Sequence, residues 1–276
     1  MGDDGAMREV LAAWGPLTVV GPISGGNRNT VLELLRGRQR LVARRSRREP
    51  ASLDWEIALL GHLSRRGIRV PAVIPAADGR LHVDGVVVQS WLAGAPPGPA
   101  DWPAVADTLR RVHAVTAGWP QRPGSASTRE LLTADRGGDV DLSLMPPDAV
   151  TDCRRAWARL AGTPEAVVHG DPGAPNIRVT AAGVGLLDWD EARLDYTDLD
   201  LAELPGYELP SRDLPRRDLP RRDLPGRDLP PGRLAAARTA ATAWEAANGW
   251  TVEPAYARRQ LSLLRARRDG FGREPR

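Results

Sequence analysis

The hydrophobic pattern of the chain changes from strand-like to helix-like near residues 90–100, and this change constrains the fold more than any other feature. Residues 17–45 hold short apolar runs, "LTVVGPI", "TVLELL" and "RLVAR", separated by glycine-containing turns. After the proline-rich segment "APPGPADWP", apolar residues recur at helical spacing. Strands followed by helices are typical of an α+β protein whose two parts form separate compact regions.

The predicted elements follow this division. In the first part, residues 54–67 have helical spacing and end in Gly67, a common helix stop. The segment "LHVDGVVVQSWLAG" predicts a hairpin that turns at Asp84-Gly85. The second part predicts four helices, at residues 102–116, 147–162, 234–249 and 254–268. We therefore expect one lobe at residues 1–92 and a helical lobe at residues 93–276.

Residues 208–233 form a tandem five-residue repeat, "ELPSRDLPRRDLPRRDLPGRDLPPGR". Proline at every fifth position excludes a helix or an interior strand, and it favours extended conformations at each preceding leucine. The interpretation we favour is a surface insertion that the fold tolerates. A lid or a docking segment is the alternative left open.

The composition excludes several classes of protein. At 276 residues, 42% of them hydrophobic, the chain can form two lobes with a core. It has no secretory signal and no apolar run near the roughly 18 residues of a membrane helix. The single Cys153 cannot form an internal disulfide, which suits a reducing compartment. We therefore predict a cytoplasmic protein without a membrane partner.

All 38 basic residues are arginine, and the sequence contains no lysine. Reactions that use a lysine amine, such as Schiff-base chemistry, are therefore excluded. The net charge is only +3, and the arginines are spread along the chain. Because no nucleic-acid-binding signature or zinc spacing accompanies them, nucleic acid is not an expected partner.

One short segment, "VVHGDPGAPNIRVTAAGVGLLDWDEA", concentrates polar residues between apolar runs. Asp171 is followed five residues later by Asn176, and a second apolar run ends at Asp188. If Thr180 faces Val184 in a hairpin, the register places Asn176 opposite Asp188, with Cα atoms about 4.5–5.5 Å apart. An amide oxygen and a carboxylate so placed can hold Mg²⁺, which prefers oxygen ligands.

This arrangement suits phosphoryl transfer. The reaction needs one residue to orient and deprotonate a hydroxyl, and metal ions to neutralise the nucleotide phosphates. Aspartate followed five residues later by asparagine is also the spacing of the protein-kinase catalytic loop. Asp171 is therefore the candidate base, and Asn176 and Asp188 are the candidate metal ligands.

The motif "HGDPGAPNI" followed by "LLDWDEA" resembles the aminoglycoside phosphotransferase and choline kinase-like family of small-molecule kinases. The resemblance implies a protein-kinase-like two-lobe fold, with a small antiparallel-sheet N-lobe and a larger, mainly helical C-lobe. It also implies transfer of the γ-phosphoryl group of ATP (or another NTP), with Mg²⁺, to a hydroxyl of a small molecule such as an antibiotic, amino alcohol or sugar. We expect a monomer or a homodimer.

The resemblance also implies roles for residues of the motif. Asp171 would be the catalytic base, and His169 would brace its loop. Asn176 and Asp188 would bind magnesium. Asp200, in "LDLA", would be structural.

The nucleotide site implied by the resemblance lies in the first lobe. Arg44 would take the place of the usual strand lysine, with Glu56 as its partner; Arg45, on the opposite strand face, is the rival. The remaining candidates are a glycine-rich phosphate loop and the segment that joins the lobes near adenine: Ser24, Gly25, Gly26, Asn27, Gln89, Ser90, Trp91 and Leu92.

Several questions stay open at this point. A catalytically weak, nucleotide-binding regulatory pseudokinase is the alternative function, although the intact motif disfavours it. A protein kinase is disfavoured because the Ala-Pro-Glu signature is missing. The sequence leaves open whether Asp190 binds a second metal ion, and which acceptor is used.

Overall fold

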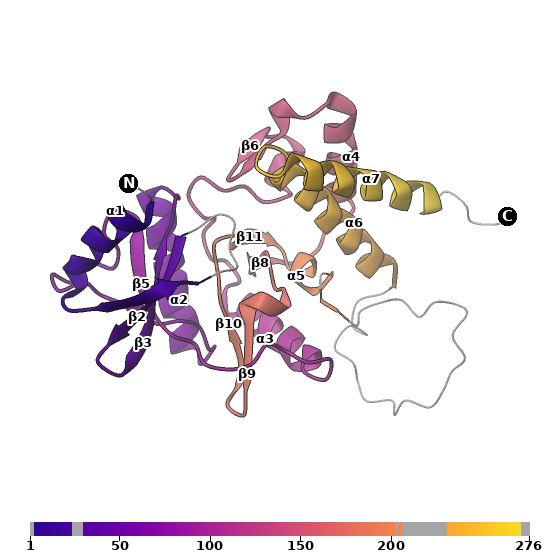
Figure 1. Ribbon diagram of the computed structural model, residues 1–276. Coiled ribbons are helices and arrows are strands. Elements are labelled where there is room, and N and C mark those ends of the chain that lie inside the picture. Colours follow the sequence, from indigo (N-terminus) through magenta and orange to yellow (C-terminus); the bar gives the residue numbers. More distant parts are fainter. Residues whose placement is uncertain (1–2, 24–29, 203, 206–230, 272–276) are drawn as a thin grey trace. The chain divides into compact units, whose positions relative to one another are not determined.

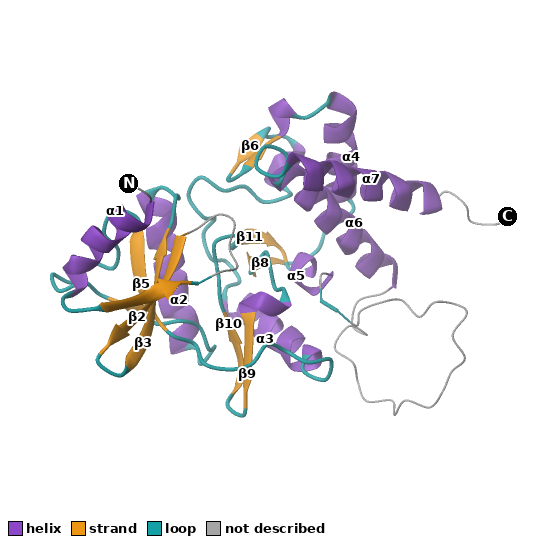
Figure 2. Cartoon of the chain, viewed as in Figure 1, coloured by secondary structure: helices purple, strands orange, loops and turns teal. Residues whose placement is uncertain are grey.

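The computed structural model describes residues 3–23, 30–202, 204–205 and 231–271, and the chain divides into two compact units (Figure 1). Unit 1 comprises Met1–Pro97 and Ala174–Asp190, and unit 2 comprises Gly98–Gly173 and Glu191–Arg276. The main sheet belongs to unit 1 and most helices belong to unit 2 (Figure 2). The architecture is α+β with an antiparallel sheet, as the sequence predicts.

Unit 1 begins with a helix and a 3₁₀ turn and contains a five-stranded sheet, one long helix and a hairpin. Its elements are α1 (Asp3–Val10), η1 (Leu11–Trp14), β1 (Thr18–Pro22), β2 (Thr30–Arg36), β3 (Gln39–Arg45), α2 (Pro50–Arg65), β4 (Val73–Ile74), β5 (Val86–Ser90), η4 (Ala174–Asn176), β9 (Ile177–Thr180) and β10 (Gly183–Leu186). Residues 174–190 belong to unit 1 by their contacts, whereas the sequence places them in the second lobe.

Unit 2 is built from helices and two short two-stranded ladders, β8–β11 and β6–β7. Its elements are α3 (Trp102–Val115), η2 (Glu130–Leu132), β6 (Arg136–Gly137), β7 (Val140–Asp141), η3 (Leu142–Leu144), α4 (Pro147–Ala158), β8 (Glu165–Val168), β11 (Arg193–Tyr196), α5 (Asp198–Ala202), α6 (Pro231–Asn248) and α7 (Pro254–Phe271). The helices predicted in both parts of the chain are confirmed as α2, α3, α4, α6 and α7. Helix α1 and the β8–β11 ladder are not predicted by the sequence.

The main sheet has the strand order β1-β2-β3-β5-β4 and is covered on both faces. Successive strand residues point to opposite faces. Val86 and Val88 of β5 therefore join the core beneath α1, whereas Val87 packs with Leu53 and Ile57 of α2. Burial on both faces explains the unbroken apolar run of β5. On β3, Ala43 faces the α1 side, so Arg44 faces α2.

The Asp84-Gly85 turn is present, with φ angles of 46° and 75°. Only one bridge, between Val83 and Val86, forms across it, so the expected hairpin is rudimentary. Strand β5 instead pairs with β3 and β4. The turn has another contact: the N–H of Ser46, just after β3, donates to the Gly85 carbonyl at 2.9 Å.

The centre of unit 2 is the alanine-rich helix α6, which contacts α4, α5 and α7. Its small buried side chains let neighbouring helices approach closely. They are Ala236, Ala237, Ala240, Ala241, Ala243, Ala246 and Ala247. Trp157 of α4 is fully buried against it and donates from its indole N–H to the Ala240 carbonyl at 3.2 Å.

Within the described residues, no helix combines the length and the apolar character that a membrane span requires. The repeat predicted to be an insertion lies outside the described residues, apart from Pro231–Arg233 at the start of α6. Its role therefore stays a prediction.

Replacing Gly85 by alanine should destabilise the protein more than the same change at Gly79. Both glycines have positive φ, so alanine is strained at each by about 1–2 kcal/mol. A Cβ at Gly85 would also lie 2.8 Å from the Ser46 carbonyl oxygen, whereas at Gly79 nothing lies within 4 Å. We expect urea unfolding to show about 1 kcal/mol or more of additional destabilisation for Gly85→Ala. Equal losses would show that the backbone at Ser46 yields freely.

Candidate active site

Residues 169–171 form a sharp turn after strand β8 of unit 2. Gly170 has a φ of 87°, and a Cβ there would lie 2.6 Å from the Glu191 carbonyl oxygen. The position therefore requires glycine. The turn leaves His169 fully buried and Asp171 exposed. The Asp171 backbone N–H lies 3.4 Å from His169 Nδ1, and the bracing role of this histidine stays a prediction.

Asp200, at the start of α5, holds this turn through its carboxylate. Its Oδ2 accepts the His169 N–H at 2.9 Å, and its Oδ1 accepts the Gly170 N–H at 3.0 Å. His113 of α3 completes the group, with Nε2 2.8 Å from Oδ2. Asp200 thus has the structural position expected for it, and His113 is a satisfied structural histidine.

The charge state of Asp200 follows from these contacts. Burial by itself would raise the pKa of the carboxyl, but the His113 contact, the nearby His169 imidazole and the Gly170 N–H together hold the pKa below its ordinary value. An ionised carboxylate can only accept, so His113 Nε2 carries the hydrogen in this bond. The turn is therefore fixed by a buried negative charge.

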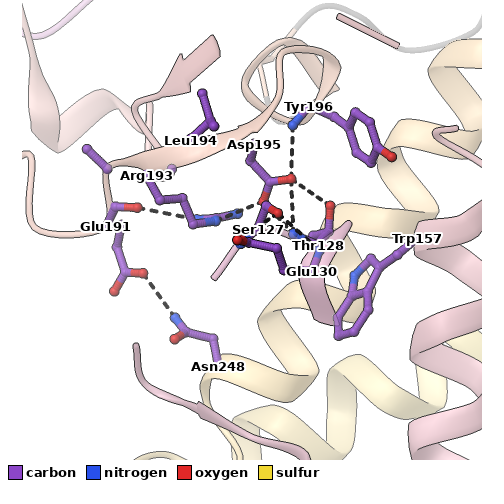
Figure 3. A network of polar contacts seen from close by, with 12 residues as sticks. Ser127, Thr128, Glu130, Trp157, Glu191, Arg193, Leu194, Asp195, Tyr196 and Asn248 are labelled. Atoms are coloured by element: carbon purple, nitrogen blue, oxygen red, sulfur yellow. Dashed lines mark hydrogen bonds and ion pairs between the residues drawn. The ribbon is translucent and has the colours of Figure 1, made fainter. Parts of the chain in front are cut away.

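A second buried carboxylate, Asp195 of β11, anchors the segment that follows Asp188 and Asp190 (Figure 3). It accepts from the Thr128 hydroxyl at 2.6 Å, from the Tyr196 N–H at 2.9 Å and from Arg193 Nε at 2.9 Å. The Arg193 guanidinium also lies 3.3 Å from the centre of the Trp244 ring. Burial lowers the pKa of Arg193, and the Asp195 carboxylate opposes this shift.

The same network reaches Glu191 and the 127–130 turn. Arg193 Nη1 donates to the Glu191 carbonyl at 3.3 Å, and Asn248 of α6 donates to Glu191 Oε2 at 3.2 Å (Figure 3). At the turn, Glu130 Oε2 accepts the Ser127 N–H at 2.7 Å, and Ser127 Oγ accepts the Glu130 N–H at 3.1 Å.

Sequence reasoning missed this network. The reciprocal Ser127 and Glu130 bonds form a capping box, and the "STRE" pattern at residues 127–130 is its recognisable signal. Arg193 and Asp195 are two residues apart on a strand, which places them on one face. No local pattern links Thr128 to Asp195.

In unit 1, Arg44 of β3 and Glu56 of α2 form a buried ion pair. The β2–β3 register sets Arg44 opposite Val31. Burial alone would lower the pKa of Arg44, but the charges of Glu56, Asp190 and Asp188 outweigh burial and raise the pKa. Arg44 therefore stays charged.

Asp190 also belongs to this ion pair. Its Oδ1 lies 3.1 Å from Arg44 Nη1, and its Oδ2 lies 3.2 Å from Arg48 Nη2. Arg48 Nη2 also donates to the Asp190 backbone carbonyl at 3.3 Å. Sequence reasoning did not single out Arg48, because nothing local marks it among the neighbouring arginines.

The predicted register of the β9–β10 hairpin is wrong by one residue. Thr180 pairs with Gly183 rather than Val184, because the turn contains only two residues. Asn176 is consequently level with Leu187, whose N–H donates to the Asn176 carbonyl at 2.8 Å. Asp188 follows in the left-handed region, with a φ of 54°, and its side chain is exposed. Residues strained in this way are frequent at functional sites.

The hairpin is held in unit 1 by Arg69 and by the segment after β5. Arg69 Nη1 donates to the Gly183 carbonyl at 2.8 Å, and its Nη2 donates to the Ala93 carbonyl at 3.2 Å. A Cβ at Gly185 would lie 2.6 Å from Leu92, so glycine permits this close approach. Asn176 and Asp188, which flank this hairpin, therefore belong to the same unit as Arg44.

The oxygen donors of Asn176 and Asp188 fit a hard divalent cation. The described residues contain no group of three or more His, Cys, Asp and Glu side chains that could hold a metal ion by themselves. Mg²⁺ in nucleotide sites usually takes one or two carboxylates and completes its shell with phosphate oxygens and water. The residues therefore fit a metal bound together with a nucleotide.

The segment predicted to contact adenine, Gln89 to Leu92, uses several of its polar groups within unit 1. The Ser90 N–H donates to the Ala72 carbonyl at 2.8 Å, and the Trp91 N–H donates to the Arg40 carbonyl at 3.2 Å. The Arg40 guanidinium also stacks on the Trp91 ring, 3.6 Å from its centre. The backbone N–H groups of Ser90 and Trp91 are therefore engaged within unit 1, and the adenine contact of residues 89–92 stays a prediction. The predicted phosphate loop, Ser24 to Asn27, lies outside the described residues.

Comparison with solved structures shows a kinase-like fold. A thermostable mutant of aminoglycoside phosphotransferase APH(4)-Ia matches with a TM-score of 0.67 and 13% identity, over 96% of this chain and 99% of that chain. Choline kinase LicA from Streptococcus pneumoniae matches with a TM-score of 0.63 and 13% identity, over 96% and 98%. Amicoumacin kinase hAmiN, in complex with AMP-PNP, Ca²⁺ and Ami, matches with a TM-score of 0.58 and 16% identity, over 98% and 87%.

The family model of the phosphotransferase enzyme family matches residues 19–261. The chain therefore belongs to this family. An uncharacterized protein of Deinococcus radiodurans is 41% identical over 59 residues. That match covers 21% of this chain and only 15% of the relative's length.

Removing His113 should destabilise the protein strongly. The His113 and Asp200 side chains are 8% and 0% exposed, so His113→Leu removes the side-chain partner of a buried carboxylate and leaves it only the two backbone N–H groups of the turn. We expect a loss of about 3–5 kcal/mol in the free energy of unfolding, measured in urea.

His82 provides the matched control. It makes a similar contact with Asp54 at 3.1 Å, but the Asp54 side chain is 68% exposed. His82→Leu should lose about 1 kcal/mol or less through this pair. A His113→Leu loss no larger than that of His82→Leu would contradict the role of Asp200 as a buried anchor.

Proposed function

We propose that the protein is an ATP-dependent kinase that transfers the γ-phosphoryl group to a hydroxyl of a small molecule. The observation that carries this proposal is the exposed Asp171 carboxylate on a turn fixed by buried Asp200. A rigid turn that presents one carboxylate to solvent suits a base that must meet a substrate hydroxyl.

Asp171 orients the acceptor hydroxyl and receives its proton. The acceptor oxygen forms a bond to the γ-phosphorus, and the bond from the γ-phosphorus to the bridging oxygen breaks, so that the nucleoside diphosphate leaves. Because this transition state is stabilised mainly by positioning and charge, most of the site has to orient groups rather than form bonds.

Unit 1 contains the residues proposed to bind the nucleotide. Arg44 offers a guanidinium to the phosphates, with Glu56 as its buried counter-ion. Asn176 and Asp188 would hold Mg²⁺ together with the phosphate oxygens. The bound ion supplies positive charge that neutralises the phosphates. Support for nucleotide and divalent metal use comes from the solved kinase with AMP-PNP and Ca²⁺.

The remaining expectations form part of the proposal. The acceptor is a small alcohol such as an antibiotic, an amino alcohol or a sugar, and the protein acts in the cytoplasm as a monomer or homodimer. The single cysteine takes no part in the chemistry. Burial raises the pKa of the Cys153 thiol to about 12, so little reactive thiolate exists at neutral pH.

The direct test is ATP consumption by the purified protein in the presence of Mg²⁺ and a panel of small alcohols. We expect ATP turnover that requires both the acceptor and the metal. Nucleotide binding without turnover on any acceptor would instead favour a regulatory, catalytically weak protein.

Asp171→Asn should abolish turnover and leave nucleotide affinity nearly unchanged, because the base acts on the acceptor and not on ATP. Loss of a general base typically lowers kcat by about 10² or more. The exposed Asp107 on α3 provides a control, and Asp107→Asn should keep normal kcat. Asp171→Asn retaining more than about a tenth of wild-type kcat would contradict the assignment.

Asp188→Asn should weaken Mg²⁺-dependent ATP binding, because it removes the charge of the metal ligand. Asparagine tolerates the left-handed conformation of this residue, so the backbone should persist. Asn176→Ala should weaken binding less, because it removes a neutral donor. Calorimetry with and without Mg²⁺ measures both effects. Unchanged Mg-ATP affinity in Asp188→Asn would place the metal elsewhere.

A further inference from the structure

Four charged side chains of unit 1 form one ion network. Arg44, Arg48, Glu56 and Asp190 have side-chain exposures of 7%, 17%, 2% and 10%. Two positive and two negative charges balance within it. Balance matters because a buried charge without a partner is strongly destabilising.

Both carboxylate oxygens of Asp190 face guanidinium groups. Oδ1 lies 3.1 Å from Arg44 Nη1, and Oδ2 lies 3.2 Å from Arg48 Nη2. A metal ligand must direct an oxygen lone pair at the ion, and two adjacent guanidinium groups repel a cation. The contacts of Asp190 are therefore those of an anchor for arginine side chains rather than of a metal ligand.

Arg48 is itself held in place at its backbone. Its N–H donates to Ser46 Oγ at 3.1 Å, and the Ser46 N–H donates to the Gly85 carbonyl at 2.9 Å. Ser46 is buried. The connection between β3 and α2 is thus fixed by the turn before β5, and Arg48 extends from this fixed point to Asp190.

We propose that Arg48 and Asp190 are positioning residues that hold the Arg44 guanidinium and the turn at Asp188 in the geometry that binds nucleotide, and that Asp190 does not ligate a metal ion. The proposal rests on the proposed function, in which Arg44 contacts the phosphates and Asp188 the metal.

The two effects have separate physical causes. The Arg44 guanidinium is planar, so contacts from Glu56 on one nitrogen and Asp190 on the other fix its orientation. Asp188 adopts a positive φ that side-chain-bearing residues rarely keep unless their surroundings hold them. Beyond it, Trp189 is 2% exposed, and Arg48 holds both the carboxylate and the carbonyl of Asp190. The residues that follow Asp188 are therefore held in place.

The test compares Arg48→Met, Asp190→Asn and the double variant with wild type. Arg48→Met keeps the apolar stem, and Asp190→Asn keeps the shape of the side chain. The exposed Arg47 gives a matched control, Arg47→Met, one residue away. For each protein, calorimetry gives the Kd for Mg-ATP, kinetics give KM for ATP, kcat and the Mg²⁺ dependence, and thermal melting reports folding.

We expect Arg48→Met and Asp190→Asn each to raise the Kd and KM for Mg-ATP about tenfold or more. Because Arg48 acts through Asp190, the double variant should be no worse than Asp190→Asn alone. Both single variants should shift the Mg²⁺ dependence in the same direction. Arg48→Lys should recover part of the affinity, since it keeps the charge but not the reach and shape of the guanidinium. Arg47→Met should match wild type.

Several outcomes would overturn the proposal that Arg48 and Asp190 are positioning residues. One is a wild-type affinity in folded Arg48→Met, and another is fully additive losses in the double variant. A shift in Mg²⁺ dependence in Asp190→Asn without one in Arg48→Met would make Asp190 a metal ligand. If Asp190→Asn does not fold, Arg48→Met and Arg48→Lys decide alone. A failure of the wild-type protein to bind Mg-ATP would contradict the proposed function, and the positioning role of Arg48 and Asp190 would fall with it.

Discussion

Buried carboxylates need partners, and this requirement organises each of the two units. Removing an ionised group from water is costly by several kcal/mol unless hydrogen bonds and opposite charges replace the lost hydration. Asp200 obtains these partners from the 169–171 turn and from His113 of α3. Because the partners come from separate segments, satisfying one charge also fixes where those segments meet. Asp195 does the same for β11 and the turn at Thr128.

A sequence without lysine changes how these charges are satisfied. A lysine ammonium is a compact point charge, whereas the arginine guanidinium can contact two acceptors from defined directions. Arg44 uses separate nitrogens for Glu56 and Asp190. Arg193 pairs with Asp195 and lies on the Trp244 ring. In both cases one arginine side chain contacts residues from different elements of the same unit.

The parts of the fold set by local patterns could be predicted from the sequence. Helical periodicity gave the long helices, and strand alternation explains why Arg44 and Glu56 meet. The β9–β10 register could not be predicted, because residues 180–183 ("TAAG") are compatible with a two- or a three-residue turn. The two-residue turn shifts the pairing by one position, so Asn176 is level with Leu187 rather than Asp188. Asp188 then follows with a positive φ, and only the folded backbone reveals this conformation.

The residues that support the site are harder to find than those that form it. Asp171, Asn176 and Asp188 lie within 18 residues of one another, so their spacing is visible as a motif. One partner of Asp190 is Arg48, 142 residues away, in a chain with 38 arginines and 35 acidic residues. Composition cannot select among so many possible pairs. The selection is made by the Gly85 turn, which fixes Ser46 and so brings Arg48 within reach of Asp190. The geometry of the candidate metal ligand thus depends on a turn about a hundred residues earlier in the chain.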